Sequence, residues 1–361
     1  MKILLTGHDG YIGTVMAPLL RAAGHEVVGM DTFFYDRCVF GDSGSGAEVV
    51  PSHRTDVRDA VAEHLDGFDA VVHLAALSND PLGELEPDVT YGINHRASVR
   101  LARLARDAGV TRFLFASSCS LYGVAGDEML DETATFHPIT AYGESKVMVE
   151  RDLSDLAAED FSPTYMRNAT VYGVSPRLRA DIVVNNLVGL AHTTGEILMK
   201  SDGTPWRPLV HVEDVCRAFL AVLEAPRETV HDRAFNVGRS GENYRIREVA
   251  EIVADAMPGT RIAFAENAGP DPRNYRVDCS LIEEILPGYR PLWTVPRGVR
   301  ELRDAFVRHG LTEDDLSSRY VRLRCIRQLR EAGDLDERLR WTVPREASVP
   351  EARHERAAGG A

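Results

Sequence analysis

Short apolar runs alternate with helical stretches through the first half of the chain, and this alternation predicts parallel βαβ units. We expect strands at residues 3–6, 26–30, 70–74 and 112–116, with helices at residues 11–23, 58–65 and 88–108. The run Val71-Val72-His73-Leu74-Ala75 is almost continuously apolar, as in a sheet covered on both faces. The sequence therefore predicts an α/β fold around a parallel sheet.

The alternation loosens beyond residue 160, where prolines interrupt it and smaller elements are expected. Residues 32–50 read as an irregular surface loop and residues 296–341 as two helices. We expect a first domain at 1–173 to which parts of 209–238 return, a substrate lobe at 174–300, a helical extension at 301–346, and a disordered tail at 347–361.

The net charge and the cysteine content argue against several kinds of partner and site. The chain has 41 Lys and Arg against 55 Asp and Glu, a formal net charge of −14, which argues against nucleic-acid or anionic-membrane partners. No apolar run approaches the roughly 20 residues of a spanning helix, and the start turns polar too soon for a signal peptide. Five scattered cysteines without a CxxC pair argue against a disulfide framework or a metal site and favour a cytoplasmic location.

A glycine-rich turn, Thr6-Gly7-His8-Asp9-Gly10-Tyr11-Ile12-Gly13, directly follows the first expected strand and opens the first helix. Glycine permits a tight turn and lets backbone N–H groups approach a pyrophosphate at the helix N-terminus, where the dipole favours anions. Gly13 would let the helix pack closely on the sheet. Structural turns also use glycine, but this position between strand and helix favours dinucleotide binding.

Two aspartates could complete such a site. Asp31 closes the second strand, where a carboxylate can accept hydrogen bonds from the adenosine ribose and would repel a 2′-phosphate, so NAD is favoured over NADP. Arg37, in the loop that follows, could instead serve a 2′-phosphate. Asp56 and Val57, just ahead of the helix expected at 58–65, could reach the adenine, although Asp56 could equally be the N-cap of that helix.

Tyr142-Gly143-Glu144-Ser145-Lys146 places a phenol and an ammonium on one helix face. A phenol titrates at about 10 and is a poor base at neutral pH. A lysine about 4 Å away interacts by roughly 4 kcal/mol at an effective dielectric near 20, or about three pKa units. The pair could therefore serve acid–base catalysis near neutral pH, although a surface Tyr and Lys would show the same spacing.

The strand expected at 112–116 is followed by hydroxyl groups at the sheet edge where ligands bind in open α/β folds, in the segment Phe115-Ala116-Ser117-Ser118-Cys119-Ser120-Leu121-Tyr122-Gly123. With the glycine turn and the Tyr142–Lys146 pair, this segment resembles the extended short-chain dehydrogenase/reductase family over about 300 residues. Further matching segments are His73-Leu74-Ala75-Ala76, Asn94, Arg167-Asn168-Ala169-Thr170-Val171-Tyr172-Gly173, the run from Arg207 to Asp214, and Phe235-Asn236-Val237-Gly238.

The resemblance implies a Rossmann-like, doubly wound sheet with a smaller C-terminal substrate lobe. It implies that Ser118 is the catalytic hydroxyl, Tyr142 the acid–base and Lys146 the residue that binds the nicotinamide ribose. The positions implied to bind NAD are Gly7, Gly10, Tyr11, Ile12, Gly13, Asp31, Asp56, Val57, Leu74, Ala75, Ala76, Asn94, Tyr142 and Lys146.

The same resemblance implies a nucleotide-sugar substrate. Asn186 and Leu187 lie in a segment similar to one that holds the nucleotide diphosphate, and Arg207 and Arg273 match two arginines that grip it. The remaining substrate positions are Asn79, Ser118, Cys119, Ser120 and Thr170. Two departures, Thr170 in place of the usual Asn and Pro208-Leu209 in place of the usual Asp-aromatic pair, leave the nucleotide and the sugar unspecified.

The reaction expected is NAD-dependent C4 epimerisation through a transient 4-keto sugar in the cytoplasm, with Tyr142 as acid–base. The resemblance also implies a homodimer in which helices near residues 94–108 and 142–158 pack as a four-helix bundle. The alternatives are a 3- or 5-epimerase or a dehydratase in which Cys119 or Ser120 is an extra acid–base group, and a non-catalytic NAD-binding regulator. The dehydratase is disfavoured because Cys119 and Ser120 stand where the 4,6-dehydratases carry Asp and Glu. A buried, inert thiol is the commoner state of Cys119.

Overall fold

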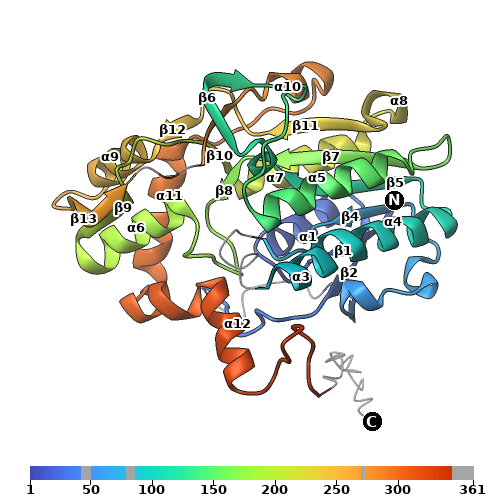
Figure 1. Cartoon of the computed structure of the whole chain (residues 1–361), viewed down its shortest axis with the longest axis horizontal. Coiled ribbons are helices and arrows are strands. Elements are labelled where there is room, and N and C mark those ends of the chain that lie inside the picture. Colours follow the sequence, from blue (N-terminus) through green and yellow to red (C-terminus); the bar gives the residue numbers. More distant parts are fainter. Residues whose placement is uncertain (42–49, 79–85, 270, 272, 344–361) are drawn as a thin grey trace, which may run out of the picture.

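The computed structural model describes residues 1–41, 50–78, 86–269, 271 and 273–343. Its centre is a seven-stranded sheet in which all neighbouring strands run parallel (Figure 1). In spatial order the strands are β11 (Arg233–Val237), β7 (Ser162–Asn168), β5 (Arg112–Ser118), β4 (Ala70–His73), β1 (Lys2–Thr6), β2 (Glu26–Asp31) and β3 (Ser52–Arg54). The order reverses between β1 and β4, where ligands bind in doubly wound folds.

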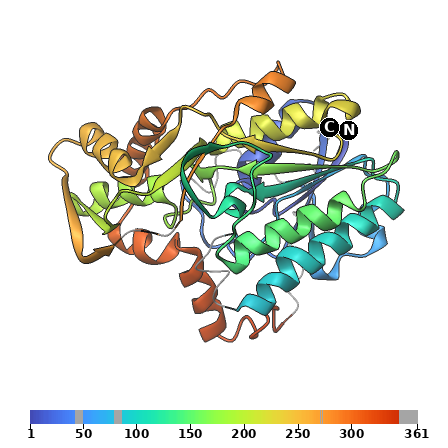
Figure 2. The ribbon, with the colours of Figure 1, turned by 45° about the horizontal axis from the view of Figure 1, so that its top comes forward.

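Helices cover both faces of this sheet (Figures 1 and 2). One face packs against α1 (Gly13–Ala22) and α7 (Val212–Glu224), and the other against α4 (Ala97–Asp107) and α5 (Ala141–Ser154). Strand side chains such as Leu4 and Leu5 point to opposite faces and enter different hydrophobic cores. This two-sided burial explains the continuous apolar runs, and the predicted α/β, doubly wound class is confirmed.

The predicted strands agree with the structure to within two residues at each end. The predicted helix at 58–65 is wrong, because this segment forms two short 3-10 turns, η1 (Val57–Asp59) and η2 (Ala62–Leu65). Asp56 accepts a hydrogen bond from the Arg58 amide at 2.8 Å and starts η1, which ends after one turn. The segment expected as one helix at 88–108 consists of α3 (Pro87–Thr90), the π-helical turn η3 (Tyr91–Arg96) and α4.

Smaller elements beyond the sheet surround its carboxyl edge. Three small sheets pair β8 (Thr170–Tyr172) and β12 (Asn243–Arg245) with β10 (Trp206–His211), β9 (Glu196–Ser201) with β13 (Arg261–Gly269), and β6 (Val124–Leu130) with β14 (Asn274–Val277). The accompanying helical elements are η4 (Cys119–Tyr122), α6 (Val183–Thr194), α8 (Arg227–Val230), α9 (Ile246–Ala256) and α10 (Ser280–Ile285).

The last described part of the chain contains the two helices expected there, α11 (Val295–His309) and α12 (Arg322–Glu331), separated by the π-helical turn η5 (Asp315–Arg319). We call residues 301–343 the C-terminal extension. It returns to the sheet, because Ile326, Leu329, Leu335 and Leu339 belong to the same hydrophobic core as α4 and α5. The predicted disordered tail lies outside the described residues, as does most of the glycine-containing stretch within the 32–50 loop. Among the described helices, none is long and apolar enough to cross a membrane.

Candidate active site

A pocket of about 1320 Å³ lies at the carboxyl edge of the sheet and runs from β2 across β1, β4 and β5 to the smaller sheets. Its walls come from the glycine turn, the starts of α5 and α6, and the C-terminal extension. The three predicted catalytic residues line this pocket together with most of the predicted binding residues. No group of three or more metal-ligating side chains occurs in the part of the chain that the structure describes.

The glycine turn forms a tight cradle at the N-terminus of α1. Gly7 has a φ of +72°, and its amide donates to the Met30 carbonyl at 2.8 Å. A Cβ at Gly13 would lie 2.2 Å from the Gly7 carbonyl oxygen, so only glycine permits this close approach. The Tyr11 hydroxyl donates to the Gly173 carbonyl at 2.7 Å and ties the turn to the end of β8. Gly7, Gly10, Tyr11, Ile12 and Gly13 all line the pocket, and this cradle fits a dinucleotide pyrophosphate.

The two predicted aspartates line the same end of the pocket but differ in their partners. Asp31 accepts from the amides of Phe33 at 2.8 Å and Asp9 at 3.1 Å. The Asp56 carboxylate is engaged by Arg58 at 2.6 Å and acts as the cap of η1. Asp31, Asp56 and Val57 all line the pocket, and Asp56 in addition caps η1.

Asn94 lies behind the pocket wall. Leu74, Ala75 and Ala76 follow β4 and line the pocket, while the Asn94 side chain is 1% exposed and outside the lining. It accepts from the Leu77 amide at 2.8 Å and donates to the Leu77 carbonyl at 3.0 Å and the Ser145 hydroxyl at 3.3 Å. Asn94 thus connects the segment after β4 to the helix that carries Tyr142.

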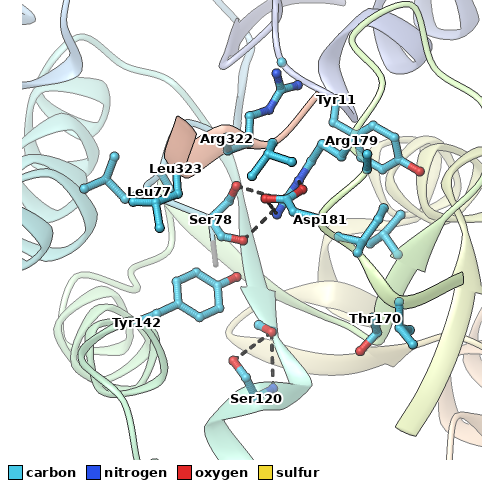
Figure 3. Close-up of a pocket in the computed structure, with 18 of the residues that line it drawn as sticks. Tyr11, Leu77, Ser78, Ser120, Tyr142, Thr170, Arg179, Asp181, Arg322 and Leu323 are labelled. Carbon is cyan, nitrogen blue, oxygen red and sulfur yellow. Dashed lines mark hydrogen bonds and ion pairs between the residues drawn. The ribbon is translucent and has the colours of Figure 1, made fainter. Parts of the chain in front are cut away.

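The predicted catalytic residues converge from β5 and α5. Figure 3 shows the Tyr142 phenol directed into the pocket between Ser78 and Ser120, with Thr170 on the opposite side. The Ser120 hydroxyl and amide donate to the Ser118 hydroxyl at 2.9 and 3.2 Å. These hydroxyls and the phenol surround one space in which a substrate hydroxyl could exchange a proton.

Lys146 lies beneath Tyr142 and is 3% exposed. Its Nζ donates to the Ala116 carbonyl at 2.7 Å and lies 5.5 Å from the centre of the Tyr142 ring. Burial lowers the pKa of Lys146 to about 7, against the smaller opposing effect of Glu150. Lys146 can therefore change its charge near neutral pH, which the sequence did not indicate.

Cys119 lies outside the pocket lining and is 1% exposed. Its thiol donates to the Arg167 carbonyl at 3.1 Å, and burial raises its pKa well above the ordinary range. Thiolate chemistry on a substrate requires the opposite shift and an accessible sulfur.

Five of the other predicted substrate residues line the pocket away from the glycine turn. Thr170, Asn186 and Leu187 line it, and Asn79 lies outside the described residues. Arg207 and Arg273 also line it, and both guanidinium groups engage Asp271, at 3.0 and 2.6 Å. Burial would raise the pKa of Asp271, but the two arginines outweigh it and keep this pKa low.

Several lining residues were not singled out from the sequence. Arg179 is 7% exposed, pairs with Asp181 at 2.9 Å and reaches the Ser78 hydroxyl at 3.2 Å (Figure 3). From the C-terminal extension come Glu313, Leu316, Ser317, Val321, Arg322, Leu323, Arg324 and Arg327. The Arg-rich composition of this extension was the only available signal, and it did not say where the extension folds back.

Comparison with known proteins agrees with this geometry. A family model described as "NAD dependent epimerase/dehydratase family" matches residues 3–238. The UDP-glucose 4-epimerase of Mycolicibacterium smegmatis is 30% identical over 321 residues, which is 85% of this chain and 98% of that protein.

Two solved structures share the fold. MoeE5 in complex with UDP-glucuronic acid and NAD matches with a TM-score of 0.74 and 26% identity, covering 85% of this chain and 99% of that one. The UDP-glucose 4-epimerase of Thermus thermophilus in complex with NAD matches with a TM-score of 0.70, 26% identity and the same coverage. The chain therefore belongs to the NAD-dependent epimerase/dehydratase family, and its cofactor is NAD.

Proposed function

We propose that this protein is a nucleotide-sugar epimerase that inverts C4 through a transient 4-keto sugar, with Tyr142 as the acid–base. The observation that carries the proposal is the meeting of the Tyr142 phenol, the Ser118 and Ser120 hydroxyls and the glycine turn in one pocket. The relatives named UDP-glucose 4-epimerase support the same reaction.

In this mechanism NAD, when bound, supplies reversible acceptance of a hydride. The chain supplies proton transfer and orientation. Tyr142 takes the proton of the sugar hydroxyl and later returns it, while Ser118 and Ser120 hold that hydroxyl by hydrogen bonds. A protonated Lys146 beneath the ring stabilises the phenolate form of Tyr142.

Substrate recognition would fall to the opposite end of the pocket. Arg207 and Arg273 bring two guanidinium groups to this end of the pocket, where both engage Asp271. A nucleoside diphosphate supplies the matching negative charge, and a planar guanidinium suits its oxygens. Asn186 and Leu187, beside Thr170, would border the nucleotide and the sugar.

A 3- or 5-epimerase or dehydratase that uses Cys119 is less well supported, because this thiol is buried, hydrogen-bonded and outside the lining. The Ser120 hydroxyl donates a hydrogen bond to the Ser118 hydroxyl. A serine hydroxyl without an adjacent base is too weak a base to remove a carbon-bound proton. A non-catalytic regulator is disfavoured because Ser118, Tyr142 and Lys146 are all present.

The deciding experiment incubates the purified protein with UDP-, GDP-, ADP-, CDP- and dTDP-sugars and identifies the products by NMR. We expect a C4 epimer from at least one sugar, without NADH accumulating in proportion to product. Steady growth of NADH absorbance would contradict epimerisation and indicate net oxidation. NAD binding without turnover of any sugar would favour the regulator.

A deuterium experiment separates the enzyme alternatives. In deuterium oxide we expect no deuterium at C3 or C5 of the product, and Cys119→Ala should keep substantial activity because the thiol does not face the pocket. Deuterium that appears at either carbon and disappears in Cys119→Ala would identify Cys119 as a base and refute the simple C4 mechanism.

We also propose a homodimer in which η3–α4 and α5 of two copies form a four-helix bundle. Both helices lie side by side on one face of the sheet (Figure 2), and Met148 on α5 is 38% exposed there. Sedimentation analysis of the wild type and of Met148→Glu tests this proposal. A monomeric wild type would contradict it, as would a variant that stays fully dimeric.

A further inference from the structure

Two cysteines from opposite ends of the chain meet beside the pocket. Cys38 lies in the loop after β2, Cys325 lies on α12, and their sulfur atoms are 3.3 Å apart. Cys38 is 4% exposed and Cys325 is 7% exposed, and all five cysteines of the chain are free thiols. The Cys325 thiol also donates to the Arg319 carbonyl at 3.2 Å.

A buried arginine for which the described part of the chain supplies no carboxylate partner lies next to this pair. Arg322 is 2% exposed, and its Nη2 donates to the Arg177 carbonyl at 2.8 Å. Among the described residues its Nη1 has no hydrogen-bond partner and its guanidinium forms no ion pair. The neighbouring Arg177 and Arg179, in contrast, are matched by Asp9 and Asp181 at 2.7 and 2.9 Å.

An unmatched buried guanidinium favours a negative charge nearby. The hydrogen bond from Cys325 and, to a lesser extent, the charge of Arg322 lower the pKa of the Cys38 thiol, against the opposing effect of burial. A thiolate is the reactive form of cysteine towards peroxides and disulfides. Cys38 is thus the nucleophile of the pair, and Cys325 is its resolving partner in contact.

The pair also joins two walls of the cofactor end of the pocket. Phe34 and Tyr35, on the loop that carries Cys38, line the pocket, as do Leu323 and Arg324 on α12. The Arg322 guanidinium lies over the Tyr35 ring at 4.0 Å, so the two walls touch beside the sulfur atoms. A covalent bond at this point would prevent α12 from moving away from the loop.

We propose that Cys38 and Cys325 form a reversible disulfide under oxidation by a hydroperoxide, and that this bond locks the C-terminal extension over the bound cofactor. The Cys38 thiolate attacks one peroxide oxygen, the O–O bond breaks, and a sulfenic acid forms as hydroxide or alkoxide leaves. Cys325 then attacks the sulfenic sulfur, and water leaves with the thiol proton. Overall the two thiols lose two electrons and two protons, and the peroxide is reduced.

Peptide mapping tests the bond itself. The NAD-bound protein is treated with hydrogen peroxide, denatured with an alkylating agent and digested without reductant. We expect a Cys38–Cys325 linked peptide that dithiothreitol reverses, while Cys119, Cys216 and Cys279 remain as alkylated thiols. Cys325→Ser should abolish the linkage. Overoxidation of Cys38 without a linked peptide, or no reaction at all, would overturn the proposal.

Arg322 is tested through the rate of linkage. Arg322→Gln should slow peroxide-driven linkage at pH 7 by about tenfold, because less thiolate is present. The matched control is Arg308→Gln on α11, which removes an exposed charge that does not line the pocket and should leave the rate unchanged. Equal rates in both variants would overturn Arg322 as the activating cation.

The lock is tested by NAD release into excess competing ADP-ribose, with no sugar present, so the outcome is independent of the proposed epimerisation. We expect NAD to dissociate at least about tenfold more slowly from the oxidised than from the reduced wild type, because the cross-link removes opened conformations. Cys325→Ser should release NAD at one rate with or without peroxide. Equal rates from oxidised and reduced wild type would overturn the lock.

Discussion

At the level of single residues, burial gives similar side chains different chemistry. Ser118 and Ser120 face the pocket, whereas Cys119 between them points to the Arg167 carbonyl behind it. Lys146 is buried under Tyr142, where its charge can influence the phenol. Neighbouring residues in the sequence thus face either the reaction space or the structure that supports it.

Tyr142→Phe removes the ionisable hydroxyl with little change in volume. We expect turnover to fall by at least about 100-fold, the scale of lost general acid–base catalysis, while the affinity for NAD and the melting temperature stay close to those of the wild type. Product formation followed by NMR, with NAD content as the control, checks this. Activity within a few-fold of the wild type would exclude Tyr142 as the proton carrier.

Lys146→Met tests the buried lysine through the pH dependence of stability. Burial lowers the pKa of Lys146 from 10.5 to about 7, so between these pH values the unfolded chain binds the extra proton. The wild type should therefore gain roughly 3 kcal/mol relative to Lys146→Met between pH 7 and pH 10. Urea unfolding of both proteins at the two pH values measures this difference. A constant difference would mean that Lys146 titrates normally.

At the level of helices and strands, an irregular turn positions a residue that supports the pocket wall. Asn94 lies in the π-helical turn η3, and its side chain forms hydrogen bonds with both the amide and the carbonyl of Leu77 after β4. Such turns often mark functional sites in otherwise regular helices. Because the same side chain also donates to Ser145, the turn connects the wall of the cofactor pocket to α5.

Asn94→Ala should leave the buried backbone groups of Leu77 unpaired and lower the free energy of unfolding by about 1–3 kcal/mol. We also expect a lower kcat, since the wall beside Tyr142 loses its connection to α5. Arg103→Ala, an exposed change on α4, is the matched control and should alter stability by less than about 0.5 kcal/mol. Equal effects of the two changes on stability and kcat would show that the connection is unimportant.

Across the molecule as a whole, the C-terminal extension joins two hydrophobic cores, because Leu302 and Phe306 pack with α6 and α9 while its later residues pack with α4 and α5. Ile326 is fully buried in the same cluster as Leu4, Leu101 and Val149. The Trp341 indole donates to the Thr32 carbonyl at 2.8 Å, which adds a polar connection to the loop after β2. The extension should therefore unfold together with the sheet.

Ile326→Ala should lower the free energy of unfolding by about 2–5 kcal/mol, the usual cost of a core cavity, within a single transition. Val307→Ala on α11, where the side chain is 64% exposed, should change it by less than about 0.5 kcal/mol. Chemical denaturation followed by both fluorescence and circular dichroism checks the size of the effect and the coincidence of the transitions. A small early transition for the extension would contradict shared folding.

Local patterns in the sequence were enough to predict the parallel α/β sheet and the glycine turn at its first strand, whereas Ser118, Tyr142 and Lys146 were singled out as one site through the family resemblance. Apolar runs, glycine spacing and helix periodicity depend on near neighbours, which is why they can be read from the chain. The prediction was wrong at 58–65, where the backbone becomes extended at Ala60 and separates the segment into two short 3-10 turns.

Only tertiary packing decides which groups are buried and which distant segments of the chain come into contact. The pKa of Lys146 depends on desolvation by residues that are far away in the sequence. Arg179 contacts Ser78, and Cys325 contacts Cys38, because segments that are far apart in the sequence pack against each other. No local pattern encodes these properties, because each arises from the packing of elements that are separated along the chain.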